Sequence, residues 1–521
     1  FASPTNISKP QTPATLREIT KRVDALFINT PHPNRYSVEI DGLDLTEYFH
    51  FTNRRNRPPL DLAYSASFLR SRVDGIHIAL LEANATRMSP ETVARKVSEL
   101  RPRVVILNTA SFDRWICPYP SLERPALLAR YVREATPDAK IIIIGPHIEV
   151  FPEASMMEVS SSDLGVLGEP EGPVAEAVMS SLDGGDLLDI PGTVARDGKG
   201  LRLYGPARPR SNLDELPFPA YDLMPLDPYQ RYGYFKSDLY SFPGRSAFIL
   251  SSRGCPFSCG FCALYVHRRG FRSRSPESVV DEIELLVKKY GVGVIRFQDP
   301  EFSIDRKRTV RICEGILDRD IRIAWSAETR YDSMDRDLLE LMRQSGCYQL
   351  NFGLESASQR VLDLIGKKQD VYQAEEVIRQ TSQVGIHASN NLIFGLPGEG
   401  RESIAQTLDF ARRLSKLPKV TFARASLSVP YPGTSLYSMG IEEGKFEPIS
   451  SWKEFPRVLR ASGQIGTEFR SLKEVKENLQ RFNNEVRRIE WSSEFGSNPW
   501  LNPRFYLRMV SKRLRGFKGG F

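Results

Sequence analysis

The sequence contains little cysteine and no long hydrophobic run. Its 521 residues include only six Cys, too few for a scaffold held together by disulfides. The apolar runs at 104–107 and 141–144 are far shorter than the roughly 18 residues that span a membrane. What is present is an ordinary globular composition, with 41% hydrophobic and 26% charged residues. This composition excludes disorder and predicts two or three hydrophobic cores.

The excess of basic charge is concentrated at the C-terminus. The chain has 71 Lys and Arg against 64 Asp and Glu, but six of the bases and none of the acids lie within 501–521. The rest of the chain therefore carries only 65 − 64 = +1, so we expect no nucleic-acid partner. The tail mixes cations with apolar residues, which indicates either a helix packed on its own domain or a helix resting on anionic lipid. We expect a cytoplasmic protein, with peripheral membrane contact as an open alternative.

The first third of the chain alternates apolar strands with helical segments. Strands are expected at 24–29, 76–81, 104–107, 141–144 and 164–167, with helices at 60–69, 90–100 and 123–134. Runs of Val and Ile without polar alternation are typical of parallel strands covered on both faces. After an extension at 1–22, the pattern predicts a doubly wound, Rossmann-like domain over 23–182, with its ligand at the strands' carboxyl ends. A chain that starts at Phe1 rather than Met is compatible with a removed leader.

A second series of strands and helices follows a connector. Between 183 and 244 the periodicity fails and Gly, Pro and Tyr accumulate. Strands are then expected at 247–250, 294–297, 321–325, 348–352, 387–394 and 421–429, with one intervening helix capped by Ser275. This α/β pattern predicts a partial (β/α)6 barrel over 245–434 with its chemistry at the carboxyl ends of the strands. The region 435–521 is mixed and mostly helical.

Three cysteines lie within eight residues, directly after the first barrel strand. Cys255, Cys259 and Cys262 form the pattern C-x3-C-x2-C, and no fourth Cys lies nearby in the sequence. A tight cluster in a large chain indicates metal binding rather than disulfides. An iron–sulfur cluster held by three thiolates keeps one iron open to a further ligand. Spacing alone also allows a structural zinc site completed by His267. The remaining cysteines are expected to be small buried hydrophobes, namely Cys117, Cys313 and Cys347.

This motif, with Phe261 before the third Cys and a β/α barrel around it, resembles the signature of radical S-adenosylmethionine (SAM) enzymes. The resemblance runs from about 248 to 434. It implies that Cys255, Cys259 and Cys262 hold a [4Fe-4S] cluster whose open iron binds the amino and carboxylate groups of SAM. One electron from the cluster would then split SAM to a 5′-deoxyadenosyl radical. The resemblance also implies an external electron donor such as flavodoxin or ferredoxin.

Further segments of the barrel match the same family. The segment 298–302 stands where many members carry a Gly-Gly-Glu-like sequence, which would accept hydrogen bonds from the SAM ammonium. Arg330 would contact the SAM carboxylate, Glu355 would accept from the ribose hydroxyls, and Gly395 would lie against the adenine. For each of these a purely local role, in an ion pair or a turn, stays open. The cofactor-binding residues that the resemblance implies in the barrel are Phe261, Gln298, Asp299, Glu328, Arg330, Glu355, Ser356 and Gly395.

The preceding domain narrows the subclass. A doubly wound domain ahead of such a barrel resembles the cobalamin-binding radical SAM group, and the segments 58–60, 167–171, 216–221 and 430–434 support this. The resemblance implies cobalamin as a cofactor, with its nucleotide tail at the sheet's carboxyl edge and the corrin facing the barrel mouth. The methionine-synthase motif D-x-H-x-x-G is missing around His32, so no cobalt ligand is assigned. The residues implied to contact this cofactor are Thr109, Gly145, His147 and Glu169.

Together the two domains predict a C-methyltransferase that acts on an unactivated carbon of a small-molecule or lipid-like substrate. The deoxyadenosyl radical would abstract a hydrogen atom, and methylcobalamin would donate the methyl group. The alternative keeps the cofactors but performs cyclisation, ring contraction or another rearrangement on a lipid, porphyrin or natural product. A non-enzymatic iron–sulfur or zinc binding module is the hypothesis from a different class. No motif identifies the substrate.

Overall fold

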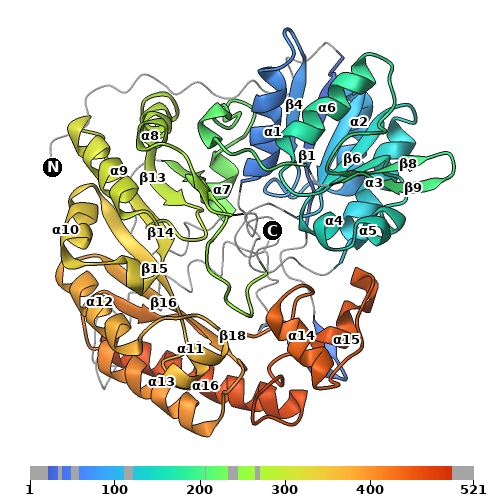
Figure 1. The fold of residues 1–521 in the computed structure, drawn as a ribbon. Coiled ribbons are helices and arrows are strands. Elements are labelled where there is room, and N and C mark those ends of the chain that lie inside the picture. Colours follow the sequence, from blue (N-terminus) through green and yellow to red (C-terminus); the bar gives the residue numbers. More distant parts are fainter. Residues whose placement is uncertain are drawn as a thin grey trace.

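The computed structural model describes residues 22–32, 38–47, 58–110, 121–205, 207–232, 245–263 and 270–495. Its elements form an N-terminal α/β domain, a half-barrel and a C-terminal helical region, which are arranged around a common centre (Figure 1). The C-terminal region lies below the N-terminal domain in this view, and the half-barrel lies to one side of both. Within the described ranges, none of the helices combines the length and the apolar character that a membrane crossing needs.

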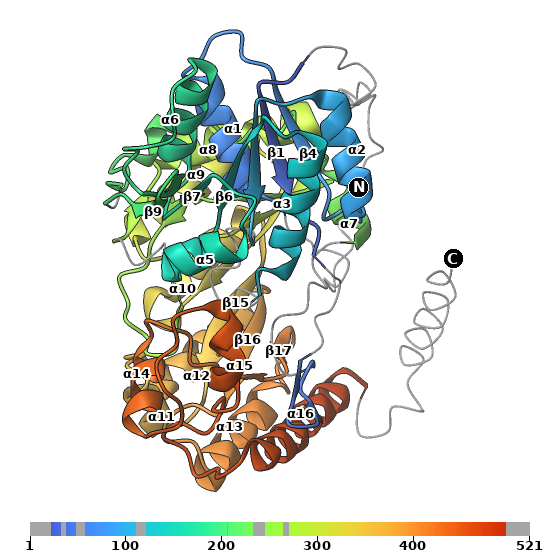
Figure 2. The same ribbon diagram turned by 90° about the vertical axis from the view of Figure 1, so that its right-hand side faces the viewer.

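The N-terminal domain is built on a parallel sheet with the strand order β4-β1-β5-β6-β7. Counted along the chain this order is 2-1-3-4-5, the flavodoxin-like arrangement, whose ligand crevice lies where β1 and β5 diverge. Helices α1 and α6 lie on one side of the sheet, and α2 and α3 on the other (Figure 2). The predicted doubly wound sheet is confirmed. Its strands are β1 (Ala25–Asn29), β4 (Ile78–Glu82), β5 (Val104–Asn108), β6 (Lys140–Ile144) and β7 (Leu164–Val166). Its helices are α1 (Leu60–Arg70), α2 (Pro90–Leu100), α3 (Glu123–Ala135), α4 (Pro146–Val150), α5 (Pro152–Glu158) and α6 (Glu171–Leu182).

The sheet extends into the expected connector. Strands β8 (Thr193–Asp197) and β9 (Gly200–Leu203) form an antiparallel hairpin that pairs with β7. The turn Asp197-Gly198-Lys199-Gly200 carries the Asp-Gly signal of a hairpin, and the added strands cover the edge of β7. The connector also contains η2 (Leu213–Glu215) and α7 (Asp227–Tyr232), and a small hairpin earlier in the chain consists of β2 (Glu39–Ile40) and β3 (Leu43–Asp44).

The half-barrel is an open parallel sheet in the order β10-β13-β14-β15-β16-β17, as predicted. The third strand begins at Ala324, not at Ile321, because the amide of Ile321 still donates to the carbonyl of Ile316 at the end of the preceding helix. The expected sixth strand is divided into β17 and β18. The strands are β10 (Arg245–Ile249), β13 (Val292–Phe297), β14 (Ala324–Thr329), β15 (Cys347–Glu355), β16 (His387–Phe394), β17 (Val420–Phe422) and β18 (Ser426–Leu427). The helices are α8 (Pro276–Tyr290), α9 (Arg306–Asp318), α10 (Arg336–Gln344), α11 (Gln359–Leu364), α12 (Val371–Gln383) and α13 (Arg401–Leu414).

The C-terminal region returns to the N-terminal domain. The indole nitrogen of Trp452 donates to the carbonyl of His147 at 3.2 Å, and the two rings meet edge to face. Arg460 and Asp41 add an exposed ion pair. The described elements are helical, as expected, and comprise α14 (Ser435–Glu442), η6 (Trp452–Glu454), α15 (Phe455–Leu459) and α16 (Leu472–Phe495). The basic tail at 501–521 and Cys117 lie outside the described residues.

Candidate active site

The three-cysteine loop follows β10 at the carboxyl end of the half-barrel. Cys255, Cys259 and Cys262 are reduced and half-buried. The loop is fixed on both sides, because the amide of Gly260 donates to Ile365 and its carbonyl accepts from Leu436. Burial raises the pKa of the Cys255 thiol, and the neighbouring Cys259 and Glu301 act in the same direction.

The donor set of this loop fits an iron–sulfur cluster. In the described part of the chain, no three His, Cys, Asp or Glu side chains are arranged around a single ion. A cubane spreads its thiolate ligands over different irons, so its ligands do not converge on one point. His267, the proposed fourth ligand of a zinc site, lies outside the described residues.

Arg330 lies directly beside the cysteine loop, as the resemblance implies. Its guanidinium carbon is 3.7 Å from the centre of the Phe257 ring, a cation–π contact between the end of β14 and the loop. The same group donates to Asp332 at 2.7 Å and to the carbonyl of Lys367 at 2.9 Å. These contacts hold the cation in one position next to the thiolates.

Glu301 is the nearby carboxylate that the sequence did not single out. Its Oε1 accepts hydrogen bonds from Ser303, Thr329 and Ser333. Its Oε2 is buried and has no hydrogen-bond partner among the described residues. Burial raises the pKa of this carboxyl. An unpaired oxygen at this place can accept from a bound ammonium group.

Asp299 is fully buried and bonds to the segment that follows β10. Its carboxylate accepts from the backbone amide and hydroxyl of Ser251 and from the hydroxyl of Ser252, so it holds the end of β10. Gln298 is buried beside it. The cofactor-binding role of Asp299 stays a prediction, and its carboxylate already accepts from Ser251 and Ser252.

Glu355 is held in an unusual backbone conformation. Its φ is +63°, the left-handed region that non-glycine residues rarely adopt, and the pairing of β15 with β16 shifts register between Gly353 and Glu355. The shift brings the carboxylate above Gly353, where Lys367 donates to it at 2.7 Å in a buried ion pair. Such strain concentrates at functional sites, which agrees with the ribose-binding role implied for Glu355.

Of the other predicted barrel residues, Phe261 and Gly395 lie close to the cysteine loop or in the turn after β16, whereas Ser356 and Glu328 contact other residues of the half-barrel. Phe261 packs with Ile365 and Leu396 in a small hydrophobic cluster under the loop, and Gly395, at φ +79°, donates its amide to Glu399. Ser356 is fully buried and bonds to Thr407 at 3.3 Å, which is a local structural role. Glu328 pairs with Arg296 inside the half-barrel, away from these turns.

Three of the residues implied to contact cobalamin, Thr109, Gly145 and His147, lie close together at the edge of the N-terminal sheet. Thr109 Oγ1 lies 2.9 Å from Nδ1 of His147, and Gly145 lies so close that an added Cβ would be 2.5 Å from that hydroxyl. The His147 ring is buried between Thr109 and Trp452. Thr109, Gly145 and His147 therefore shape the loop after β6 chiefly by contacting one another.

A second polar group at this edge escaped the sequence analysis. Glu82, at the end of β4, accepts from Asn29 at 2.8 Å and from the hydroxyl of Tyr229 in the connector. Asn108 donates to Asn29 at 2.9 Å and completes the network across β4, β1 and β5. Burial raises the pKa of Glu82 to about 7. The network lies at the point where the strand order diverges.

Buried ion pairs tie the N-terminal domain to the cysteine loop. Arg253, two residues before Cys255, donates to Glu171 at 2.6 Å and lies 3.3 Å from Glu169. Glu169 also pairs with Arg272 in the strand β12 (Arg272–Ser273), which faces β11 (Ser252–Arg253). Glu169, implied to contact cobalamin, is thus engaged by two arginines of the half-barrel.

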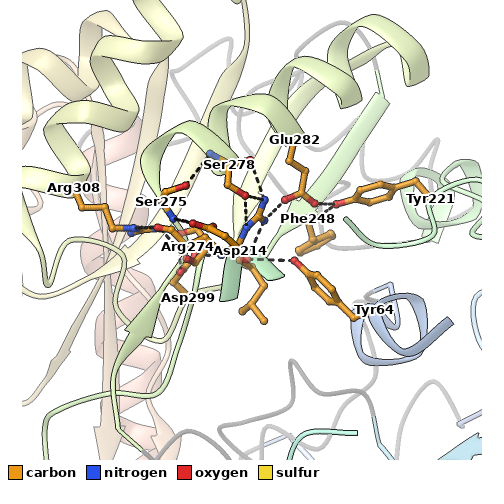
Figure 3. Close-up of polar contacts among 12 residues, drawn as sticks. Tyr64, Asp214, Tyr221, Phe248, Arg274, Ser275, Ser278, Glu282, Asp299 and Arg308 are labelled. Carbon is orange, nitrogen blue, oxygen red and sulfur yellow. Dashed lines mark hydrogen bonds and ion pairs between the residues drawn. The ribbon is translucent and has the colours of Figure 1, made fainter. Parts of the chain in front are cut away.

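A second buried network surrounds the end of β10 (Figure 3). Arg274 pairs with Glu282, whose other oxygen accepts from Tyr221 of the connector at 2.6 Å. Tyr64 of α1 donates to the carbonyl of Leu250, and Arg308 donates to that of Ser251 at 2.8 Å. The end of β10 is therefore held by the N-terminal domain, the connector and two barrel helices.

Fold and site together define a two-domain class of protein, in which a flavodoxin-like domain is locked to a half-barrel whose first strand leads into a three-cysteine loop. Residues 249–411 match the family model of the radical SAM superfamily, which identifies this segment of the chain as a radical SAM domain. The protein is therefore an enzyme that uses a [4Fe-4S] cluster and SAM.

Individual relatives agree with this assignment. An uncharacterized methyltransferase of Pyrococcus horikoshii is 29% identical over 77% of this chain and 82% of its own. The anaerobic magnesium-protoporphyrin IX monomethyl ester cyclase of Rubrivivax gelatinosus is 28% identical over 79% of this chain and 69% of its own. The solved structure of the cobalamin-dependent SAM radical enzyme OxsB with aqua-cobalamin bound has a TM-score of 0.68 at 17% identity, covering 95% of this chain and 71% of that one. The shared fold extends over both domains.

Proposed function

We propose that the protein is a cobalamin-dependent radical SAM methyltransferase that methylates an unactivated carbon of a small molecule. The observation that carries this proposal is the buried Arg253–Glu171 contact, which fixes the cysteine loop against a flavodoxin-like domain. When bound, the cluster supplies the electron that splits SAM, and the corrin supplies the methyl group. Among the relatives, a methyltransferase supports this outcome.

The chain's own residues would bind and orient these groups. We propose Cys255, Cys259 and Cys262 as cluster ligands and Arg330 as a partner of the SAM carboxylate. The unpaired Oε2 of Glu301 would accept from the SAM ammonium. Glu355, held by Lys367, would accept from the ribose hydroxyls. Phe261 and the turn at 395–398 would support the adenine side of the site.

The proposed domains are a cobalamin-binding domain at 23–182, a connector at 183–244, a radical SAM barrel at 245–434 and a helical region after 435. The crevice between β1 and β5 is the place for the nucleotide tail. We further propose a cytoplasmic location and electron supply from a protein such as flavodoxin or ferredoxin. Any membrane contact through the basic tail lies outside the described residues.

Anaerobically reconstituted protein tests the proposal. With SAM and dithionite it should form 5′-deoxyadenosine, and after gel filtration it should retain added cobalamin. SAM with a trideuterated methyl group should label the product. Cys259→Ser should abolish deoxyadenosine formation. Protein that retains no corrin would contradict the cobalamin-dependent function.

Cyclisation is the second candidate, since a cyclase is among the relatives. It differs from methylation in the fate of the label. Substrate-dependent deoxyadenosine without trideuteromethyl transfer would support the cyclase, and labelled product would exclude it.

A further inference from the structure

The two sheets of this protein differ in what their strands present. In the N-terminal domain, β1, β5 and β6 consist almost wholly of buried apolar residues on both faces. In the half-barrel, polar and apolar residues alternate along most of β14 and β15 and at the start of β16. Because neighbouring residues of a strand point to opposite faces, the alternation separates one apolar face from one polar face.

The apolar face is the one covered by the helices. Trp325 of β14 is fully buried, and its indole nitrogen donates to the carbonyl of Ser345 at the end of α10. Its register partner Ile295 is also buried. Helices α8, α9, α10, α12 and α13 lie outside the sheet on this side (Figure 1). Ser326, next to Trp325, therefore faces the inside of the half-barrel.

The inner face is polar across adjacent strands. One row runs through residues in register on four strands and a second row follows one layer nearer the carboxyl ends. The first row contains Arg296, Ser326, Gln349 and His387. The second row contains Glu328, Asn351, Ser389 and Thr421. Closed β/α barrels fill such layers with branched apolar side chains, so an inner face of this kind is made for polar contents.

Most of these groups are satisfied in pairs. Arg296 is matched by Glu328, Gln349 donates to Asn351 at 2.8 Å, and Nε2 of His387 lies 2.9 Å from the hydroxyl of Thr421. The one cation and the one carboxylate of the two rows offset each other. The face therefore presents little net charge.

Three neutral groups remain available, namely one from each row and Asn391, which lies one layer nearer the carboxyl ends. The hydroxyl of Ser326 is buried and lacks a hydrogen-bond partner among the described residues. Ser389 and Asn391 of β16 are half-buried, and within the described ranges neither side chain makes a hydrogen bond. Two strand spacings, about 10 Å, separate β14 from β16, which matches a small molecule.

We propose that the substrate is a small polar molecule bearing hydroxyl or amide groups, and that Ser326, Ser389 and Asn391 bind it on this inner face. The inference rests on the proposed function, in which a radical formed beside the cysteine loop must reach the bound substrate. A hydrocarbon lipid would offer these groups no hydrogen-bond partner and would remove Ser389 and Asn391 from water, which is unfavourable. The polar face thus argues against a lipid substrate.

The substrate class is tested by partition of an extract. A cell extract of the source organism is divided between water and chloroform, and each phase is given to the reconstituted holoenzyme with trideuteromethyl-labelled SAM and reductant. We expect the aqueous phase to raise deoxyadenosine formation and to contain the labelled product. A response confined to the chloroform phase would overturn the polar class and leave methyl transfer intact. Deoxyadenosine raised by the aqueous phase without label would support the polar class and contradict methyl transfer.

Variants test the residues. Asn391→Leu should reduce the response to the aqueous phase about tenfold, the value of one lost hydrogen bond. Asn478→Leu, the same exchange on α16, should leave it unchanged. An equal response from both variants would overturn the role of Asn391. If neither phase gives a response, the proposed function fails, and an anaerobic crystal structure decides the polar class. Ordered water or a polar ligand on Ser326 and Asn391 would support it, and a dry or detergent-filled face would overturn it.

Discussion

The guanidinium of Arg253 donates to the carboxylate of Glu171 at 2.6 Å, and both side chains are almost fully buried. Arg253 stands two residues before the first cysteine of the loop, whereas Glu171 begins helix α6 of the N-terminal domain. A buried ion pair of this kind adds little stability compared with two apolar side chains of the same size. It does fix the relative position of the two segments that carry its partners. The contact sets where the cysteine loop lies relative to the crevice of the first domain.

Breaking this pair should cost more than breaking an exposed one between the N-terminal domain and the connector. Glu171→Gln leaves the buried cation without its nearest charge, so we expect the free energy of unfolding to fall by about 3 kcal/mol in denaturant titrations. Arg70→Ala removes an ion pair to Asp222 that also joins α1 to the connector but is half-exposed. That control should lose about 1 kcal/mol or less. Equal losses would show that the buried pair does not lock the domains.

The cysteines should separate cleanly by role. Cys259→Ser should leave the purified protein without its full content of iron and sulfide, whereas Cys313→Ala should retain both. Cys313 is buried, and burial raises the pKa of its thiol to about 12, so it should resist alkylation in the native protein. Metal analysis and labelling under anaerobic conditions measure this. Zinc in place of iron would revive the alternative of a structural zinc site.

The strained backbone at Glu355 predicts an unusual order of variants. Glycine tolerates a φ of +63° better than alanine by about 1 kcal/mol, so Glu355→Gly should be more stable than Glu355→Ala. Both should bind SAM more weakly in equilibrium dialysis, because both lack the carboxylate. A Glu355→Ala variant of equal stability would mean that the position relaxes. Undiminished SAM binding would remove Glu355 from the cofactor site.

Glu82 predicts a pH dependence of stability. Burial raises its pKa from 4.5 to about 7, so between these values the folded protein binds a proton that the unfolded chain has released. Stability should therefore fall as the pH rises from 4.5 through about 7, by about 3 kcal/mol in all. Glu82→Gln should make this part of the curve less steep in denaturant titrations, whereas Glu99→Gln, on the exposed face of α2, should leave the steepness unchanged.

Glu399 should extend the fall of stability with rising pH beyond the range set by Glu82. Its pKa is raised to about 8 by burial, so Glu82→Gln should leave a decline that continues to about pH 8. A curve that is flat from pH 4.5 to 8 in the unaltered protein would show that both carboxyls are solvated in solution.

Much of the fold was predictable because local patterns agree with it. The apolar runs of β1, β5 and β6 and the cap of α8 at Ser275 stand in the structure as predicted, since burial on both faces and a helix N-terminus leave direct marks in sequence. The hairpin β8–β9 was missed because neither strand forms a continuous apolar run and β9, at the sheet edge, is largely exposed. The hydrogen bonds of Asp299 to Ser251 and Ser252 could not be predicted, because these neighbours in space follow a different strand.

The sequence by itself indicated metal binding by the cysteine loop, because C-x3-C-x2-C places three thiols within eight residues. It also determined the order of the two α/β domains, because strand and helix periodicities are local. Only the tertiary structure decided that Glu169 and Glu171 engage Arg253, that Glu301 keeps an unpaired oxygen, and that the inner face of the half-barrel is polar. Each of these depends on residues far apart in the chain meeting at a particular register, and a side chain's partners, unlike its spacing, are set by packing.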